Sequence, residues 1–310
     1  MSSPSAALRL LVSDDDLAAV EHLELFASRL VQGMLTGRHD SRMKGGCSEF
    51  AEHRAYSLGD EVRNLDWRVM AKTDRYYVKQ FHEESNLSTV LVLDASGSMA
   101  YGDSTASKFV HARAAAACLT RLLLGQRDPV ALAVAGGVEV PFVPARSTPA
   151  HLFSIIDSLS RTNCGGKNAL LQTLDRLVRQ VKHRSQFILL TDAFVDVDRL
   201  EALLRVLPIR GHELLLFQVL APEELSFPFR EGIRFESLEG DSQFFNIDPT
   251  VFADTYLDRM QSFIIRLRQS CLRAGGDYYA LPTHVPVGKS LADYLKRRAQ
   301  RSGRAGGRPG

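Results

Sequence analysis

Cysteine is scarce in this sequence, and its residues are far apart in the chain: Cys47, Cys118, Cys164 and Cys271. None belongs to a CxxC pair, which argues against a zinc site and favours four free thiols in a reducing compartment. No charge-free apolar run approaches the roughly 18 residues that a membrane helix needs. Acidic residues in the N-terminal stretch SDDDLAAVEHLELF argue against a signal peptide. These absences predict a cytoplasmic protein with no membrane insertion.

A strong net charge is also missing, because 38 basic residues nearly balance 36 acidic ones and leave +2. The last fifteen residues, KRRAQRSGRAGGRPG, hold six Lys or Arg and no acid, and taking these six charges from +2 leaves −4 for residues 1–295. The composition of this end predicts a disordered, solubilising tail over residues 299–310. A nucleic-acid-binding arm is the alternative interpretation, and the solubilising tail is preferred.

Apolar strands and amphipathic helices alternate regularly from Thr89 onwards. The expected strands are TVLVLDAS, DPVALAVAGG, VEVPFVP, SQFILLTDAF and HELLLFQVL. The expected helices are KFVHARAAAACLTRLLLGQ, PAHLFSIIDSLS, ALLQTLDRLVRQV and DVDRLEALLRVL. Strands that are apolar throughout are typical of a parallel sheet covered on both faces. The pattern therefore predicts an open, doubly wound α/β domain with a mostly parallel sheet.

The flanking segments divide the rest of the chain. Residues 1–36 form an N-terminal segment with a helix expected over 15–36, and residues 37–85 are predicted to be short strands and turns. The α/β domain is expected over residues 86–298. It includes a hairpin at about 231–247, followed by a long helix that a proline opens and Gly275–Gly276 closes, then a last strand and a last helix.

Oxygen-bearing side chains follow two of the expected strands. Asp94, Ser96 and Ser98 come directly after TVLVL, and Asp192 follows FILLT. Ligands bind beyond the carboxyl ends of the strands in an open α/β sheet, so neighbouring strands would bring the four side chains together. Carboxylates and hydroxyls are hard oxygen ligands, the set expected for Mg²⁺ with waters completing an octahedron. A polar turn that caps a helix is the competing interpretation.

Enzyme motifs match less well. A nucleophile elbow needs Gly-x-Ser-x-Gly, which LDASGS lacks. CGGKNALL suggests a phosphate-binding loop, but Arg161 stands where the first glycine belongs and Asn168 replaces the Ser or Thr. An aspartyl-phosphate enzyme would usually carry a second acid at the position of Ser96. None of the nine histidines lies by sequence next to a candidate nucleophile.

The motifs DASGS and LLTDAF in an alternating α/β chain resemble a von Willebrand factor A domain with its metal-ion-dependent adhesion site. The segment EFAEHRAYSLGDEVRNLDWRVMAKTDRYYVKQFHEE resembles the signature of a bacterial family catalogued as domain of unknown function family fifty-eight, and AGGDYYALPTHVPVGKSLADYLKRR resembles the family's end. The matching signature residues are Glu49, Arg54, Tyr56, Gly59, Asp60, Arg63, Asp66 and Trp67.

The signature also has a physical interpretation. Charges of alternating sign, Arg54, Asp60, Arg63 and Asp66, surround a glycine and the only tryptophan. Such charges usually tie a turn together by ion pairs, with Trp67 packed beneath. A structural role is therefore the first interpretation, and a partner-docking surface is the second.

The resemblance implies a metal site at Asp94, Ser96, Ser98 and Asp192. This sequence departs from the pattern of that site at one position. The adhesion site usually has a threonine ligand in a loop that corresponds to RTNCGGKNAL, where Lys167 stands instead. Asn168 could supply a carbonyl oxygen, and Thr162 is a distant substitute. Alternatively, the ammonium of Lys167 could replace the cation as counter-charge, or could point into water.

The predicted function is a non-enzymatic protein-interaction module. The resemblance implies an adaptor or co-chaperone of a MoxR-type AAA+ ATPase, because relatives are often encoded beside such ATPases. A Mg²⁺-dependent hydrolase that uses Asp94 and Asp192 is the first alternative. Nucleic-acid binding through the basic tail is the second.

Overall fold

The computed structural model describes residues 8–9, 11–21, 23, 49–55, 65–67, 69–70, 76–82, 87–103, 106–136, 142–230, 233–236, 244–247 and 249–305. The chain divides into two compact units. One consists of residues 1–37 and 87–310, and the other of residues 38–86. Each unit is described by itself.

A six-stranded sheet forms the centre of the larger unit, in the order β10-β7-β6-β3-β4-β5. All neighbours are parallel except β4 and β5, which are antiparallel. Counted along the chain, this is the order 3-2-1-4-5-6 of doubly wound folds, and the predicted fold class is confirmed. The strands are β3 (Ser88–Asp94), β4 (Val130–Ala135), β5 (Phe142–Arg146), β6 (Ser185–Thr191), β7 (Glu213–Leu220) and β10 (Asp277–Pro282).

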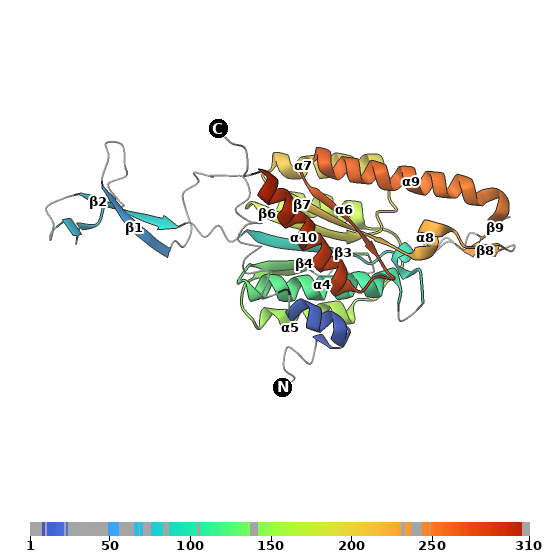
Figure 1. Cartoon of the computed structure of the whole chain (residues 1–310), viewed down its shortest axis with the longest axis horizontal. Coiled ribbons are helices and arrows are strands. Elements are labelled where there is room, and N and C mark those ends of the chain that lie inside the picture. Colours follow the sequence, from blue (N-terminus) through green and yellow to red (C-terminus); the bar gives the residue numbers. More distant parts are fainter. Residues whose placement is uncertain are drawn as a thin grey trace. The chain divides into compact units, whose positions relative to one another are not determined.

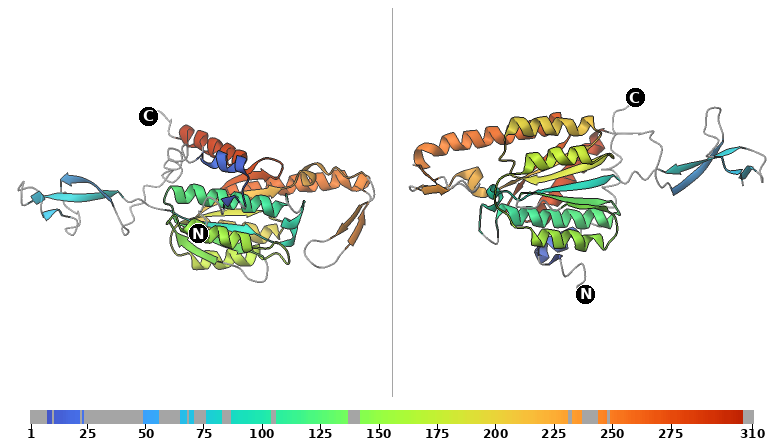
Figure 2. Two further views of the ribbon diagram at one scale, coloured as in Figure 1. Left: turned by 90° about the horizontal axis from the view of Figure 1, so that it is seen from below. Right: turned by 180° about the vertical axis from the view of Figure 1, so that it is seen from behind.

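Helices cover both faces of this sheet, as Figures 1 and 2 show. One hydrophobic core lies between the sheet and α4, α5 and α10. A second core lies on the other face, beneath α6, α7 and α9. The helices are α4 (Lys108–Gly125), α5 (His151–Arg161), α6 (Leu170–Gln180), α7 (Val197–Ile209), α9 (Pro249–Arg273) and α10 (Val287–Ala305).

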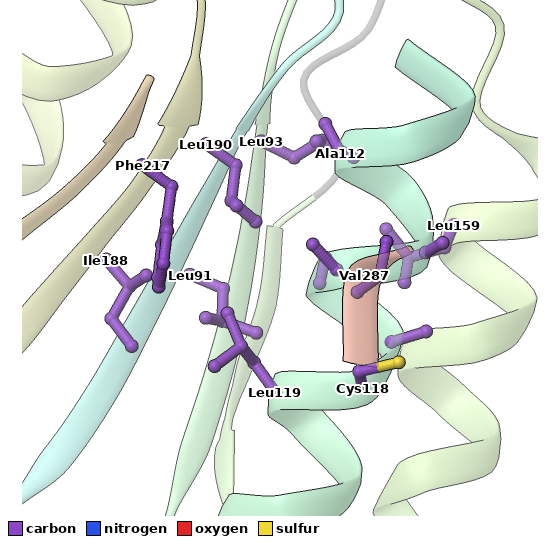
Figure 3. Packing of buried hydrophobic residues seen from close by; sticks show 14 of the residues in the cluster. Leu91, Leu93, Ala112, Cys118, Leu119, Leu159, Ile188, Leu190, Phe217 and Val287 are labelled. Carbon is purple, nitrogen blue, oxygen red and sulfur yellow. The ribbon is translucent and has the colours of Figure 1, made fainter. Parts of the chain in front are cut away.

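Successive side chains of the central strand β3 enter opposite cores. Leu91 and Leu93 pack on the α4 side, whereas Val90 and Val92 belong to the core on the other face. Figure 3 shows the first of these cores, with Leu91 beside Leu119 of α4. A strand that is buried on both faces must be apolar at every position, which is the pattern that the sequence has between Val90 and Leu93.

An extension follows β7 along the chain. The short helix α8 (Pro222–Ser226) comes first, and β8 (Ile233–Glu236) then pairs antiparallel with β9 (Phe244–Ile247), so the expected hairpin forms. The sequence did not predict α8. The 25-residue helix α9 starts directly after the hairpin, and Phe227, after α8, contacts the rings of Phe252 and Tyr256 on its first turns.

The last helix continues further than the sequence predicted. α10 extends to Ala305, so the expected disorder is wrong for residues 299–305, and residues 306–310 lie outside the described part. Arg298 and Arg301 of α10 lie 3.5 and 3.4 Å from the carboxylate of Asp277. Ion pairs to the folded sheet give the basic segment a reason to be helical. At the other end of α10, Gly288 donates its N–H to Asp16 at 2.7 Å.

The smaller unit contains one antiparallel pair, β1 (Glu49–Ala55) and β2 (Tyr77–His82). Asp66 is buried there and accepts a hydrogen bond from the Val69 N–H. Trp67 is 58% exposed, so the expectation that it packs beneath the turn is wrong. The two residues before it, Leu65 and Asp66, are buried.

Half of the eight signature residues lie in the described part of the chain: Glu49, Arg54, Asp66 and Trp67. Arg54 is in β1 and pairs with Val78 through the backbone. The remaining predicted signature residues, Tyr56, Gly59, Asp60 and Arg63, lie outside the described residues, as do Cys47 and the later part of the N-terminal helix expected over 15–36. Within that helix, residues 14–21 are helical.

Two predicted absences concern thiols and membrane helices. Cys118, Cys164 and Cys271 are free thiols. Within the ranges that the structure describes, no helix is both long enough and apolar enough to cross a bilayer.

Candidate functional site

The carboxyl-terminal ends of β3 and β6, here called the carboxyl edge, bring the two predicted aspartates together. β3 and β6 are neighbours in the sheet, with Leu93 opposite Leu190. Asp94 ends β3, and Asp192 follows the last residue of β6. Both side chains have no exposed surface. The sequence-based expectation that the two carboxylates share one edge is therefore what the structure shows.

Asp94 is held by internal donors. One carboxylate oxygen accepts a hydrogen bond from the Ser96 N–H at 2.9 Å, and the other accepts one from the Thr191 hydroxyl at 2.6 Å. Burial, followed by repulsion from Asp192, raises the pKa of Asp94 to about 6. The carboxylate thus carries its charge at neutral pH in a place that disfavours it, which leaves a demand for positive charge nearby.

The two predicted serine ligands lie side by side. The hydroxyl oxygens of Ser96 and Ser98 are 3.2 Å apart, and Ser98 begins to reach the surface while Ser96 is buried. A short 3₁₀ helix over Gly97–Ala100 begins directly after Ser96, and its tight turn brings the Ser96 and Ser98 hydroxyls together. Two adjacent hydroxyls at this spacing can both face one hard cation.

The positive partner of Asp192 is a lysine that the sequence did not single out. Lys108 is at the start of α4, is 1% exposed, and places its ammonium 2.7 Å from Asp192 and 2.6 Å from Glu224. Asp192 also accepts the Phe194 N–H at 3.1 Å. The Phe194 ring lies 4.7 Å from the same ammonium, in cation–π contact. Three elements, α4, β6 and α8, are therefore joined by one buried ion triplet.

Burial also affects Glu224, the third member of this triplet. The pKa of Glu224 is raised, mainly by burial, although the neighbouring Lys108 opposes the rise. Its second oxygen accepts the Ala221 N–H at 2.8 Å and closes the first turn of α8. Glu224 thus fixes both the ammonium and the start of that helix.

Lys167 does not have the counter-charge role that was one of its predicted alternatives. It is exposed on the loop between α5 and α6, and the ammonium beside Asp192 is that of Lys108. Asn168 uses its carbonyl oxygen to accept the Leu170 N–H at 2.9 Å, which caps the start of α6. The Thr162 hydroxyl donates to the Ser158 carbonyl at 2.8 Å.

The loop between α5 and α6 is nevertheless hydrogen-bonded to the DASGS turn, residues 94–98. The N–H of Gly97 donates to the Gly166 carbonyl at 3.0 Å, and the N–H of Gly165 donates to the Ala95 carbonyl at 2.9 Å. The Cys164 thiol lies 3.0 Å from the Ser96 carbonyl oxygen. These bonds place Lys167 directly beside the turn while its side chain is in solvent.

The residues present fit a weakly held hard cation. Asp192 and Glu224 pair with the single buried ammonium of Lys108, and Asp94 is buried as a third carboxylate, so the cluster keeps an excess of negative charge when all are ionised. No group of three or more His, Cys, Asp or Glu side chains in the described part of the chain could share a metal ion. A cation would therefore depend on Asp94 together with the hydroxyls of Ser96 and Ser98.

Comparison with known proteins gives a family and no activity. The family model described as "Protein of unknown function DUF58" matches residues 52–251. The uncharacterized proteins Mb1516 of Mycobacterium bovis and Rv1480 of Mycobacterium tuberculosis are each 31% identical to this chain over 256 residues, which is 81% of this chain and 80% of each relative.

Solved structures with similar folds are more distant. The conserved hypothetical protein BatB from Bacteroides thetaiotaomicron has a TM-score of 0.44 at 13% identity, with 69% of this chain and 99% of that chain covered. The VWA domain of SpRpn10 has a TM-score of 0.41 at 9% identity, with 67% and 94% covered.

Proposed function

Because the chain belongs to the DUF58 family of proteins of unknown function, we propose a function from the site itself: a protein-interaction module that binds a partner at the carboxyl edge. The observation that carries the proposal is the excess of buried negative charge beside Ser96 and Ser98. A cation bound there would be shared with a carboxylate of the partner, as in the adhesion site that the sequence resembles.

Exposed apolar side chains near this charge support binding over catalysis. Phe194, two residues after Asp192, and Leu225 of α8 are both exposed. Aromatic side chains such as phenylalanine are enriched in protein interfaces, so an exposed Phe194 beside this site suits a protein partner. The carboxylates of Asp192 and Glu224 are both bonded to Lys108, so they are poorly placed to take a proton from a substrate.

The proposed cation is Mg²⁺, held by Asp94 and by the hydroxyls of Ser96 and Ser98. When bound, it would supply an open coordination position for a carboxylate of the partner. Asp192 would act through its charge, because one of its oxygens already forms an ion pair with the Lys108 ammonium at 2.7 Å.

The proposed partner is a MoxR-type AAA+ ATPase, with this chain as its adaptor. We expect the purified chain to bind such an ATPase from the same genome in 5 mM Mg²⁺, and to lose at least tenfold in affinity in EDTA or with Ser96→Ala/Ser98→Ala. Ile209→Ser, which changes an 81% exposed apolar residue at the end of α7, serves as the control. Biolayer interferometry measures the affinities. Absence of binding under every nucleotide condition would reject the partner, and equal affinity of all variants would reject the site.

Substituting Lys167 with threonine is expected to strengthen Mg²⁺ binding about fivefold at low salt. The change removes one positive charge beside the DASGS turn, where it repels a divalent ion by about 1 kcal/mol in water, and it adds a neutral oxygen. Calorimetric titration compares the two proteins, with Lys182→Thr, an exposed lysine after α6, as the matched control. Binding that is undetectable in both the parent and Lys167→Thr would contradict the proposed cation.

A further inference from the structure

A basic pocket surrounds the first half of β10, the strand at one end of the sheet. The pocket has a volume of about 160 Å³ and is lined from α9 on one face and from α10 on the other. The residues that line it are Arg268, Asp277, Tyr278, Tyr279, Ala280, Tyr294, Arg297, Arg298 and Arg301. It lies at the amino-terminal end of β10, whereas Asp94 and Asp192 are at the carboxyl ends of the parallel strands.

The pocket carries more positive than negative charge. Four of its lining residues are arginines and one is an acid, Asp277, which is shared by Arg298 and Arg301. The Arg297 guanidinium lies 5.5 Å from the centre of the Tyr279 ring. Arg268 of α9 is exposed on the other face. Guanidinium groups recognise carboxylates with paired hydrogen bonds, so the pocket is suited to acidic groups.

The backbone of β10 offers a second means of recognition. In the described sheet, β10 pairs with β7 alone, with Asp277 opposite Leu215 and Pro282 opposite Leu220. An edge strand presents unpaired N–H and C=O groups along its outer side, which an extended peptide can use to add a further strand. All of its residues except Leu281 are partly exposed, so the helices on either side leave the strand accessible.

We propose that the β10 edge binds an extended, acidic segment of a partner protein, which lies alongside β10 as an additional strand. Side chains of a strand alternate between the two faces of the sheet. Acidic residues at alternate positions would therefore face the three arginines of α10, and an acid at an intervening position would face Arg268 of α9. Main-chain hydrogen bonds supply affinity, and the arginines select the charge. This surface is separate from the carboxyl edge, so either can fail without the other.

A peptide suits this surface better than a nucleic acid does. The four arginines line a pocket of about 160 Å³, and residues 1–295 together carry −4, the value left when the six basic residues of the last fifteen are taken from +2. A nucleic acid would require a longer basic path along its backbone, and it could not form the strand hydrogen bonds that the edge of β10 offers.

The experiment uses the full chain and a fluorescein-labelled octapeptide of four Thr-Glu repeats, in which the glutamates point to one side when it is extended. Fluorescence anisotropy at low salt is expected to show binding in the micromolar range. The matched Thr-Gln peptide, which keeps the backbone and loses the charge, should bind at least tenfold more weakly. Equal affinity for the two peptides, or tighter binding of an oligothymidylate of the same charge, would overturn the proposal.

Variants locate the binding on the protein. Arg297→Ala/Arg301→Ala removes two exposed arginines of α10 that would face the glutamates, and it is expected to weaken Thr-Glu binding at least tenfold. Two exposed basic residues elsewhere, changed in Arg176→Ala/Lys182→Ala, form the control with the same loss of charge. Equal effects of the two double variants would mean unspecific attraction and would overturn the proposal.

Amide hydrogen exchange tests the added strand. Saturation with the Thr-Glu peptide is expected to slow exchange at least fivefold in the segment from Asp277 to Leu281. Peptide binding with unchanged exchange in this segment would overturn the additional strand.

Discussion

Replacing Lys108 with methionine is expected to lower the free energy of unfolding by about 3–5 kcal/mol. Methionine keeps the length and most of the packing of the lysine stem, so the loss is that of the ammonium. Without it, the carboxylates of Asp192 and Glu224, 2.7 and 2.6 Å from the nitrogen, stay buried and unpaired. Urea denaturation of the two proteins measures the difference.

A triple variant that also neutralises the carboxylates of Asp192 and Glu224 tests whether their unpaired charges cause the loss of stability. Lys108→Met/Asp192→Asn/Glu224→Gln is expected to recover most of the lost stability, because neutral amides can be buried at lower cost than unpaired carboxylates. Lys182→Met, at an exposed position, should change the stability by less than about 0.5 kcal/mol. A loss below about 1 kcal/mol for Lys108→Met would show that the triplet does not hold the edge together. If the single variant fails to fold, the triple variant must still fold.

Gly136→Ala is expected to lower the free energy of unfolding by about 3 kcal/mol or more and to disturb the DASGS turn. Gly136 follows β4 with a φ of +127°, and an added Cβ would lie 2.7 Å from the Ala95 carbonyl carbon and 2.8 Å from its oxygen. That backbone cannot easily move, because Ala95 bonds to Ala135 through its N–H at 2.7 Å and to Gly165 through its carbonyl at 2.9 Å. Denaturation measures the stability, and amide hydrogen exchange of residues 94–98 reports on the turn.

Gly165→Ala separates the two causes. Gly165 has a comparable φ of +144°, but an added Cβ there would meet no atom within 4 Å. Its cost should be limited to the backbone strain, about 1–2 kcal/mol. Equal losses for Gly136→Ala and Gly165→Ala would mean that the close approach between β4 and the turn contributes nothing.

Much of the fold could be predicted from local pattern. Apolar runs without polar interruption identified the parallel strands, and the aspartates at the end of β3 and directly after β6 identified the carboxyl edge. The prediction succeeded because strand periodicity and strand ends are local properties, and because parallel strands end at the same side of a sheet. Asp94 and Asp192 therefore meet at one edge although they are 98 positions apart by their numbers.

The extent and surroundings of these elements were less predictable. The basic end of the chain has the composition of a disordered tail, yet α10 extends to Ala305 because folded-state carboxylates such as Asp277 lie beside its arginines. Trp67 was expected to be buried because tryptophan is a large apolar residue, but it is exposed. Composition does not report which neighbours a helix or a turn will have.

The sequence by itself determined the α/β class, the carboxyl edge and the oxygen-bearing residues that lie there. Only the tertiary structure decided that the buried positive charge at this edge is the ammonium of Lys108. In SKFVHARAAAACL, Lys108 has the appearance of an ordinary solvated residue at the start of a helix. Its burial arises because Asp192, 84 residues later, and Glu224, 116 residues later, converge on its ammonium. Charge pairing across such separations depends on how α4, β6 and α8 pack together, and no local periodicity encodes that arrangement.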